Sequence, residues 1–510
     1  MKKDFFREDW EGYVPVPVCD DRPEYGEFYN IAWKMVRDHV KHIDGMPQSP
    51  YMDEAFCATQ VWIWDSCFMS LFCKHAREVF PGVETLNNFY EVLHGGGHLA
   101  KITVPNDEPS WTSNKPGETA EMKICIADNP PLFAWAEYEN ALFSGDREYV
   151  RDLLCERRVL QKHYEWIESL KEFSRFPGVR SQSRLISCDI GYKWEGGRSG
   201  MDNTPRGRIG EKAEAERPNN PDMLWIDAIC QQALSAKMIA ALAEKIGDNA
   251  MRDEWLVKYN EKKDIVNKYY WDEKDGFYYD IDCNTHEFYK VMSIASYWTL
   301  ISGIADEKRA AEMVKYLLDP NHFGGELPLI SLSRSDADYI PDGRYWRGSL
   351  WLPTAYATVR GLDSYGYFDE ARSASEKILA RMIRTYNEFE PHTIWECYSP
   401  EKAMPGMNPH NTELSRPDFC GWSALGPISL YIEYVLGFHR VDAFERRVEW
   451  IRPTELSGRV GIKNLRFGDV VTDIVAENGV CRVVSNEAYT LSIDGRDHEI
   501  PTGICEIKLN

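Results

Sequence analysis

Two carboxylates lie far apart in the sequence but in similar loops. Asp202 is part of Gly-Met-Asp-Asn-Thr-Pro (residues 200–205), so turn chemistry and not a helix is expected to fix its backbone. Glu396 lies in Trp-Glu-Cys-Tyr (residues 395–398), also outside a helical pattern. Apolar neighbours such as Trp194 raise the pKa of a carboxyl group, as a general acid at neutral pH requires. An ordinary turn is the alternative explanation for the Asp202 segment.

Aromatic and charged side chains lie beside the same loops. Two carboxylates can protonate a leaving oxygen and activate a nucleophile, and tryptophan rings can form a platform for a sugar, so the set is typical of a glycoside hydrolase. A structural role is the alternative for two members: Asp65 lies where an acidic residue stabilises a helix start, and Arg347 could pair with a helix-end carboxylate. The residues expected to contact substrate are Trp64, Asp65, Trp194, Tyr345, Trp346, Arg347, Trp395 and Trp422.

Composition excludes several classes of partner. The formal net charge of the 510 residues is −22, which disfavours nucleic acid and anionic membrane surfaces. The start of the sequence lacks a signal-peptide pattern, and no apolar run is long enough for a membrane span. The 13 cysteines form no Cys-x-x-Cys pair, so we predict no disulfide framework and a cytoplasmic, reducing setting. The oligomeric state stays open.

Histidine and glycine clusters do not form recognisable binding motifs. His94, His98, His392 and His410 are not spaced with acidic residues as metal ligands, and we expect them to form loop hydrogen bonds. The triple glycine at 95–97 lacks the residues that follow it in a phosphate-binding loop. The sequence therefore predicts no metal and no cofactor.

Helical periodicity predicts the architecture. Twelve stretches are expected to be helical, and they are 24–44, 62–78, 84–95, 129–144, 146–170, 221–246, 248–271, 287–303, 306–319, 348–361, 366–386 and 422–437. Long connections alternate with short ones, so every long loop is expected at one end of six antiparallel helix pairs. This order predicts a mainly α fold, an (α/α)6 barrel, with functional loops around one mouth.

The ends of the chain have a different texture. Residues 1–23 are polar and contain proline, and we expect a surface arm. From about residue 441, period-2 stretches alternate with Asn-Gly and Asp-Gly turns, which predicts a small antiparallel β module. The expected division is therefore an arm (1–23), a catalytic barrel (24–440) and a C-terminal β module (441–510).

Four segments together resemble glycoside hydrolase family 63, which includes processing α-glucosidase I and is similar to mannosylglycerate hydrolases and, more distantly, trehalases. The segments are 200–206 (GMDNTPR), 345–351 (YWRGSLW), 395–400 (WECYSP) and 421–425 (GWSAL), with 64–68 (WDSCF) resembling the family's early Trp-Asp-x-x-Phe. The resemblance spreads over most of residues 60–437 and follows the family's order. It implies an (α/α)6 barrel, independently of the loop pattern.

The resemblance also implies roles by position. Asp202 would be the general acid, and Glu396 would be the general base that activates water, inverting an α-linked anomeric carbon. Trp64, Asp65, Trp346, Arg347 and Trp422 would line the sugar subsite at the scissile bond. We expect no counterpart of the large N-terminal β domain of eukaryotic glucosidase I in this sequence. The expected substrate is therefore a small α-linked glucoside or a related sugar.

Other readings stay open. The loop around Asp202 is rich in arginine and lysine, which could hold a carboxylate on the aglycone or could be paired internally. A sugar epimerase or polysaccharide lyase could use the same barrel, with His or Tyr abstracting a carbon-bound proton. A sugar-binding protein without catalysis is the third possibility. The basic residues of this loop are Arg175, Arg180, Arg184, Lys193, Arg198, Arg206 and Arg208.

Overall fold

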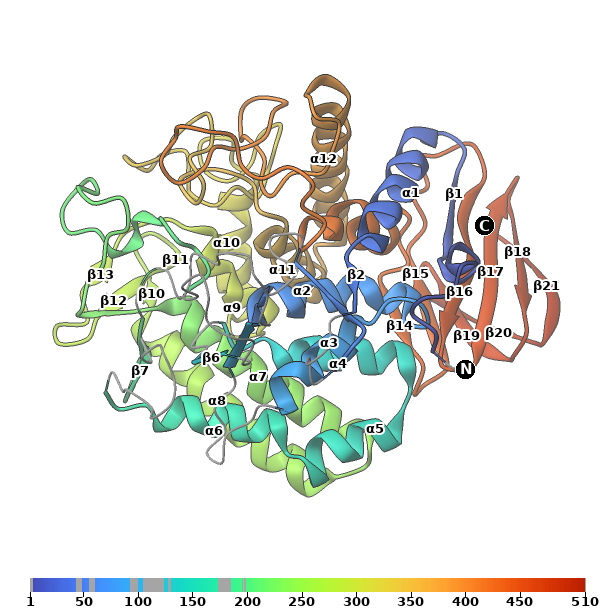
Figure 1. Cartoon of the computed structure of the whole chain (residues 1–510), viewed down its shortest axis with the longest axis horizontal. Coiled ribbons are helices and arrows are strands. Elements are labelled where there is room, and N and C mark those ends of the chain that lie inside the picture. Colours follow the sequence, from blue (N-terminus) through green and yellow to red (C-terminus); the bar gives the residue numbers. More distant parts are fainter. Residues whose placement is uncertain are drawn as a thin grey trace.

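The computed structural model of the chain describes residues 3–42, 48–54, 60–91, 100–103, 123–126, 130–172, 185–194, 196 and 199–509. Within these residues a large helical part lies beside a smaller β part, and both chain ends lie on the β side (Figure 1). Among the described helices, none combines the length and the apolar character needed to cross a membrane.

The helices agree in order with the predicted stretches. They are α1 (Pro23–Arg37), α2 (Ile63–Cys73), α3 (Gly82–Glu91), α4 (Phe133–Ser144), α5 (Arg147–Arg151), α6 (Val159–Ser169), α7 (Ile226–Lys245), α8 (Asn249–Tyr269), α9 (Trp298–Ile301), α10 (Glu307–Leu318), α11 (Leu352–Ser364), α12 (Phe368–Glu388) and the π-helical η8 (Gly426–Val435).

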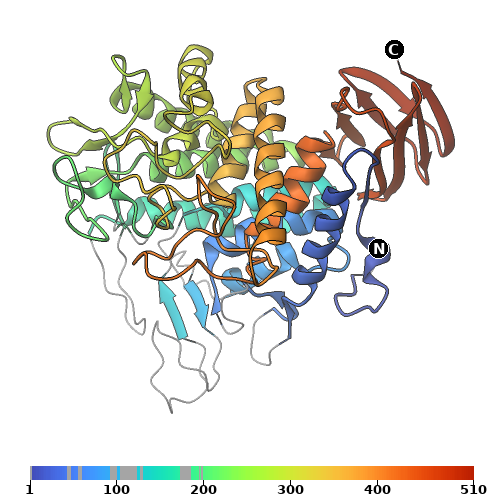
Figure 2. The same ribbon diagram turned by 90° about the horizontal axis from the view of Figure 1, so that it is seen from above.

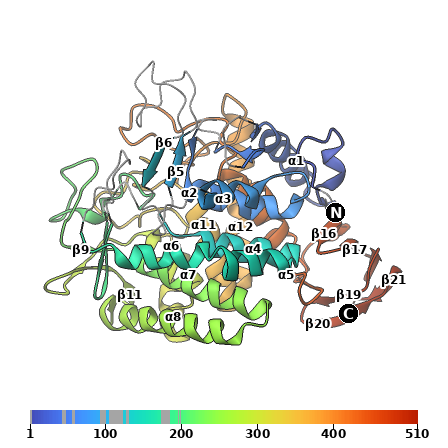
Figure 3. The same cartoon turned by 60° about the horizontal axis from the view of Figure 1, so that its bottom comes forward.

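One set of helices forms the inner layer. α2, α9 and η8 are buried along their whole lengths, as expected for helices that are apolar on all sides. Successive contacts link α2 to α4, α4 to α7, α7 to α9, α9 to α11 and α11 to η8, which contacts α2 in turn. α8 instead buries Trp255, Tyr259 and Val266 against α7 and leaves its other faces polar. Figure 3 shows α4, α7 and α8 lying side by side.

The connections alternate as the sequence predicts. Short turns follow inner helices, such as the left-handed Gly145 (φ +63°) after α4 and Gly247 after α7. Long segments precede inner helices, including residues 319–351 before α11 and 389–422 before η8. The inner helices therefore all begin at the loop-rich end, where irregular segments spread beyond the helices (Figure 2).

Several predicted boundaries were wrong. The expected helix 146–170 is interrupted by a π turn, and Arg158 adopts φ +54°, a left-handed conformation that ends one helix before the next begins. The expected helix 287–303 begins instead as a strand, because Phe288 and Tyr289 pair with β12. The expected helix 24–44 ends at Arg37 and is followed by a strand.

Short strands shape the loop-rich end. They are β2 (Val40–Lys41), β3 (Tyr51–Met52), β4 (Gln60–Val61), β5 (Ala100–Thr103), β6 (Lys123–Ile126), β7 (Leu185–Cys188), β8 (Gly191–Trp194), β9 (Met223–Leu224), β10 (Trp271–Asp272), β11 (Phe277–Tyr278), β12 (Asp280–Asp282) and β13 (Phe288–Tyr289). Their pairing makes small hairpins and ribbons, such as β13-β12-β9 and β4-β5-β6, and no continuous sheet within the described residues.

The C-terminal β module contains two sheets. One has the order β1-β16-β17-β18-β21 and the other β14-β15-β19-β20. The strands are β1 (Val16–Cys19), β14 (Arg440–Asp442), β15 (Arg447–Trp450), β16 (Val460–Phe467), β17 (Val470–Glu477), β18 (Val480–Ser485), β19 (Tyr489–Ile493), β20 (Arg496–Ile500) and β21 (Gly503–Lys508). The ring of Phe467 packs edge-on against that of Tyr489, 5.5 Å away in the other sheet.

Two features of this module were not predicted. β15 and β19 pair in parallel, whereas the other strand pairs of the module are antiparallel. The N-terminal segment contributes β1 to the edge of the larger sheet, with Val16 opposite Lys463 and Cys19 opposite Val460. The predicted domain division at residues 23 and 440 stays a prediction.

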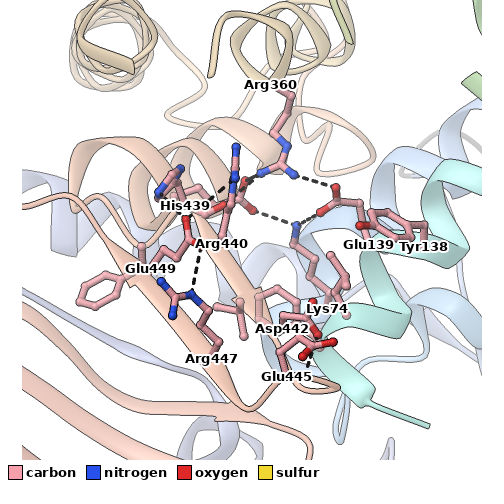
Figure 4. Close-up of a pocket in the computed structure, with 15 residues that line it drawn as sticks. Lys74, Tyr138, Glu139, Arg360, His439, Arg440, Asp442, Glu445, Arg447 and Glu449 are labelled. Carbon is pink, nitrogen blue, oxygen red and sulfur yellow. Dashed lines mark hydrogen bonds and ion pairs between the residues drawn. The ribbon is translucent and has the colours of Figure 1, made fainter. Parts of the chain in front are cut away.

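A polar cavity of about 450 Å³ lies where the helices meet the β module, at the end away from the long loops. Lys74 Nζ lies 2.9 Å from Glu139 and 3.1 Å from Glu433, and Arg360 Nη2 lies 2.7 Å from Glu139. Figure 4 shows the side chains of Lys74, directly after α2, Glu139 of α4 and Arg360 of α11 converging. Glu433 comes from η8. The buried charges neutralise one another, so this network joins the C-terminal halves of α4, α11 and η8 to the residue that follows α2.

Candidate active site

Glu396 is a buried carboxylate held by neutral donors at the loop-rich end. Its side chain is 4% exposed. Oε1 accepts a hydrogen bond from the Tyr345 hydroxyl at 2.9 Å, and Oε2 accepts one from the main-chain N–H of Arg416 at 3.3 Å. Burial raises the pKa of Glu396, the charge of Arg416 opposes that effect, and the negative charge of Asp202 adds to it. A carboxylate with a raised pKa is a better proton acceptor.

The backbone of Glu396 is fixed from several directions. Its N–H donates to the carbonyl of Arg416 at 2.9 Å. Its own carbonyl accepts from the indole N–H of Trp422 at 3.1 Å and from the Ser423 hydroxyl at 3.3 Å. The predicted residue Trp422 therefore contacts the predicted base, and it anchors the base loop to the start of η8.

Asp202 projects from a tight turn toward solvent. Thr204 N–H donates to the Met201 carbonyl at 3.0 Å and closes the turn. The Asp202 side chain is 33% exposed, with Arg217 Nη2 3.6 Å from Oδ2. The charge of Asp202 raises the pKa values of both Glu396 and Tyr345, although burial is the main cause for each. The two carboxylates therefore lie close enough for the charge of one to act on the other, and their catalytic roles stay a prediction.

The ring of Trp64 packs against Gly200, in the turn that carries Asp202. Gly200 adopts φ +80°, and a Cβ there would lie 3.1 Å from the Trp64 ring. A side chain at position 200 would therefore clash with the ring, which explains glycine at this position. Trp64 itself is 4% exposed and packs against Phe68 and Trp298.

Arg206 anchors the same loop to the core. Its guanidinium pairs with both oxygens of Asp227 at 2.8 Å and with both oxygens of Asp280, at 2.6 and 2.8 Å. It also lies 4.6 Å from the ring centre of Trp225. Arg206 is 1% exposed. The two aspartates neutralise its charge, so Arg206 is not available to bind a ligand.

The rest of the basic loop is divided between paired and undescribed residues. Arg208 pairs with Asp336 and Asp338, and Lys193 lies 3.6 Å from Asp222. These contacts favour internal pairing over carboxylate binding for the described members. The others lie outside the described residues, as do the histidines and glycines of the sequence hypotheses: Arg175, Arg180, Arg184, Arg198, His94, His98 and residues 95–97.

Arg347 holds loops together. Its Nε donates to the carbonyl of Asn203 at 3.2 Å, and Nη2 donates to the carbonyls of Ala215 and Glu216 at 3.0 Å each. Nη1 lies 3.4 Å from Asp338. These contacts stabilise the segment after Asp202, and contact of Arg347 with substrate stays a prediction.

The predicted aromatic residues differ in their surroundings. Trp346 is 1% exposed and stacks on Trp351, with ring centres 4.1 Å apart. Trp395 and Trp194 are each 2% exposed, and Trp194 lies on β8, which packs on the start of α7. Asp65, on the first turn of α2, is also buried. Little of these side chains is accessible in this structure, and their contact with a sugar stays a prediction.

Sequence reasoning missed three contributors. Asn203 is fully buried, and its side chain links the Asp202 loop to the 344–347 turn, although the sequence indicates only a turn residue. Arg206 reads as one of many basic residues, although Asp227 and Asp280, which hold it, are remote in the sequence. Glu54 is buried, and burial together with the charge of Asp65 raises its pKa. Asparagine directly after a suspected acid is the one local signal that could have directed attention to position 203.

Comparisons with known proteins show the family of the chain. The family model of the mannosylglycerate hydrolase MGH1-like glycoside hydrolase domain matches residues 58–413. The chain is 27% identical over 465 residues to an uncharacterized protein of Borreliella burgdorferi, covering 87% of each. It is 27% identical over 412 residues to the periplasmic trehalase of Escherichia coli O1:K1, covering 74% of this chain and 69% of that protein.

A solved structure shows the same fold. The GH63 mannosylglycerate hydrolase of Thermus thermophilus, in complex with glucose, superposes with a TM-score of 0.58 at 17% identity, covering 79% of this chain and 99% of that one. The predicted resemblance to glycoside hydrolase family 63 is thereby confirmed. The family match covers more than half of the chain and includes both carboxylates. The protein is a glycoside hydrolase and belongs to the mannosylglycerate hydrolase MGH1-like family.

Proposed function

We propose that the protein is an inverting α-glycosidase that hydrolyses a small α-linked glucoside or a related sugar, with Asp202 as general acid and Glu396 as general base. The observation that carries this proposal is the pairing of a partly exposed carboxyl group with a buried carboxylate held by neutral donors. When two carboxyl groups have different environments, one can be protonated while the other is ionised. Acid–base hydrolysis requires this, because one group donates a proton and the other accepts one.

The reaction would proceed in one displacement. Glu396 would take a proton from water while the water oxygen forms a bond to the anomeric carbon. Asp202 would give its proton to the leaving oxygen as the glycosidic bond breaks, so that the charge is balanced. An inverting mechanism requires the two carboxyl groups to stand roughly 6.5–9.5 Å apart, with room for the water.

The known relatives limit the choice of substrate. A trehalase and a mannosylglycerate hydrolase are among the proteins that this chain resembles, so α-linked glucose and a glycosylglycerate are the first candidates. The internal pairing of Arg206 and Arg208 favours a neutral aglycone, whereas Arg217 beside Asp202 is half-exposed and could meet an anionic one. Substrate comparison must decide between them.

The architecture and setting are proposed on the same footing. The closed succession of contacts from α2 through η8 supports an (α/α)6 barrel whose mouth carries the site. Free cysteines such as Cys67 and Cys230 in the core are compatible with a reducing, cytoplasmic setting.

The test is a hydrolysis panel that contains α,α-trehalose, other α-linked disaccharides, mannosylglycerate and glucosylglycerate. We expect turnover of at least one of them, and loss of that turnover in Glu396→Gln while the variant still binds the same compound. Exchange of deuterium into a recovered sugar without hydrolysis would indicate an epimerase or lyase instead. Tight binding without turnover across the panel would indicate a sugar-binding protein.

A further inference from the structure

A four-residue turn connects the loop of the proposed acid to the loop of the proposed base. Asn203, which follows Asp202, reaches this turn through its side chain: Nδ2 donates to the carbonyl of Arg344 at 3.2 Å, and Oδ1 accepts from the main-chain N–H of Trp346 at 2.8 Å. The Asn203 side chain is fully buried. Asn203 therefore forms hydrogen bonds to the backbone on both sides of Tyr345.

Tyr345 is held in an uncommon conformation. Its φ is +55°, which is unfavourable for a bulky side chain and persists only where surrounding contacts impose it. Those contacts are on both sides: Tyr345 N–H donates to the carbonyl of Met407 at 3.0 Å, and the indole N–H of Trp351 donates to the Tyr345 carbonyl at 3.1 Å. The tyrosine ring packs edge-on against Trp351, with centres 4.6 Å apart.

The strained conformation directs the Tyr345 hydroxyl to Glu396. It donates to Oε1 at 2.9 Å, while the Arg416 N–H donates to Oε2 at 3.3 Å. A carboxylate gripped on both oxygens cannot rotate freely, so each remaining lone pair points in a fixed direction. The direction of the Oε1 lone pairs is set by the turn, and the turn is set by Asn203.

We propose that Asn203 and Tyr345 are positioning residues that together fix the Glu396 carboxylate relative to Asp202. The chain of contacts runs from Asp202 to the adjacent Asn203, through the backbone of the 344–347 turn, to the Tyr345 hydroxyl and Oε1 of Glu396. The inference rests on the proposed function, because it assigns to these residues the spacing that an acid–base pair needs.

The first test is Tyr345→Phe, which removes one oxygen and keeps the ring. Glu396 is faced by Tyr345, Arg416, Asp202 and the adjacent Cys397. The tyrosine hydrogen bond stabilises the ionised carboxylate and lowers its pKa, so its loss raises that pKa. We expect the acidic limb of the kcat/KM profile to move to higher pH by about one unit, with a roughly ten-fold loss of kcat and little change in KM.

The second test is Asn203→Ala, alone and combined with Tyr345→Phe. Both changes release the same carboxylate, so we expect the double variant to lose little more kcat than the worse single variant. Thermal unfolding shows whether each variant folds. Asn203→Asp provides a second variant at this position, because it keeps the acceptor for the Trp346 N–H but places a carboxylate oxygen, in place of the donor, against the Arg344 carbonyl. We expect it to lose kcat as Asn203→Ala does.

Tyr339→Phe is the matched control. Tyr339 also donates its hydroxyl to a glutamate, the exposed Glu401, which lies in the same 389–422 segment as Glu396. This change should leave both kcat and the acidic limb in place. An unmoved acidic limb in Tyr345→Phe, or fully additive losses in the double variant, would overturn the inference.

The outcomes also separate this inference from the proposed function. If the wild type hydrolyses its substrate and Glu396→Gln does not, an unmoved limb in Tyr345→Phe rejects only the positioning roles. If Glu396→Gln retains full hydrolysis, the proposed base is rejected, whatever the two positioning variants do.

Discussion

Two buried glutamates, Glu433 and Glu396, lie at opposite ends of the inner helices and differ in their surroundings and in the direction of their pKa shifts. Glu433 lies beside two cations, Lys74 at 3.1 Å and Arg360 at 3.6 Å, and beside His75 at 3.1 Å, whose pKa is lowered by burial. Although burial acts against it, these partners hold the pKa of Glu433 far below its usual range. Glu396, buried to a similar extent, accepts hydrogen bonds from a tyrosine hydroxyl and a main-chain amide, and burial keeps its pKa raised although the charge of Arg416 opposes that effect.

The difference teaches that burial alone does not identify a catalytic carboxylate. A buried charge surrounded by opposite charges cannot take up a proton at neutral pH, whereas one held by neutral donors can exchange it. Glu137 qualifies the rule, because it too is held by neutral donors, the hydroxyls of Tyr90 and Tyr149. Its carboxylate is hydrogen-bonded to α3 and α5 within the helical part, and not to the loops of Asp202 and Glu396, so a raised pKa must be combined with position.

Replacement of Glu396 should have the largest effect on activity. Glu396→Gln keeps the shape of the side chain and removes its basicity, so we expect kcat to fall by a factor of roughly 10³ or more, with the melting temperature nearly unchanged. Steady-state kinetics and thermal unfolding measure the two quantities. Full activity in this variant would contradict the catalytic role of Glu396 and therefore its contrast with Glu433.

Asp202→Asn should have a loss that depends on the leaving group. For a natural sugar aglycone, kcat should fall by a factor of about 10²–10⁴, because the leaving oxygen is no longer protonated. For a glycosyl fluoride, which needs little acid assistance, the loss should be much smaller. Equal losses on both substrates would remove Asp202 from the acid role.

Glu433→Gln should cost stability. The change leaves Lys74, His75 and Arg360 with one carboxylate fewer, and breaking a buried ion pair costs about 3–5 kcal/mol. Chemical denaturation at pH 7 measures this loss. The folded pKa of Glu433 is lowered, so its contribution is present above the unfolded pKa and is lost as pH falls through the acidic range. A variant as stable as the wild type at pH 7 would contradict the structural role.

Glu137→Gln should have the smallest effect and the opposite pH dependence. Burial raises the pKa of Glu137 to about 7, so the folded state binds a proton more tightly than the unfolded state, and wild-type stability falls as pH rises from about 4.5 to about 7. The glutamine variant lacks this decline, and at pH 8 it should be more stable than the wild type by roughly 1–3 kcal/mol. Denaturation at pH 5 and pH 8 tests the sign.

Much of the helical order could be predicted from the sequence, because apolar periodicity and the lengths of connections are local properties. The spacing of long loops predicts the segments of Asp202 and Glu396 at one end, and both segments contact the 344–347 turn. The break at Arg158 and the strand at Phe288 were missed, since a left-handed residue and a strand pair depend on tertiary partners.

The sequence reveals the chemical groups of the candidate site and not the residues that support them. Asp202, Glu396 and Tyr345 have side chains whose chemistry is evident from their type, and the structure brings them together. Asn203 and Arg206 have roles that depend on residues remote in the sequence, such as Asp227 and Asp280 for Arg206. Such pairings carry no periodic signal, so one sequence alone cannot reveal them.

The most direct test of the acid–base assignment is the configuration of the first product, followed by proton NMR as an α-linked substrate is hydrolysed. An inverting pair made of Asp202 and Glu396 predicts that the β-anomer appears first and then mutarotates to the equilibrium mixture. Initial release of the α-anomer would show retention and would contradict the role of Glu396 as a base acting on water.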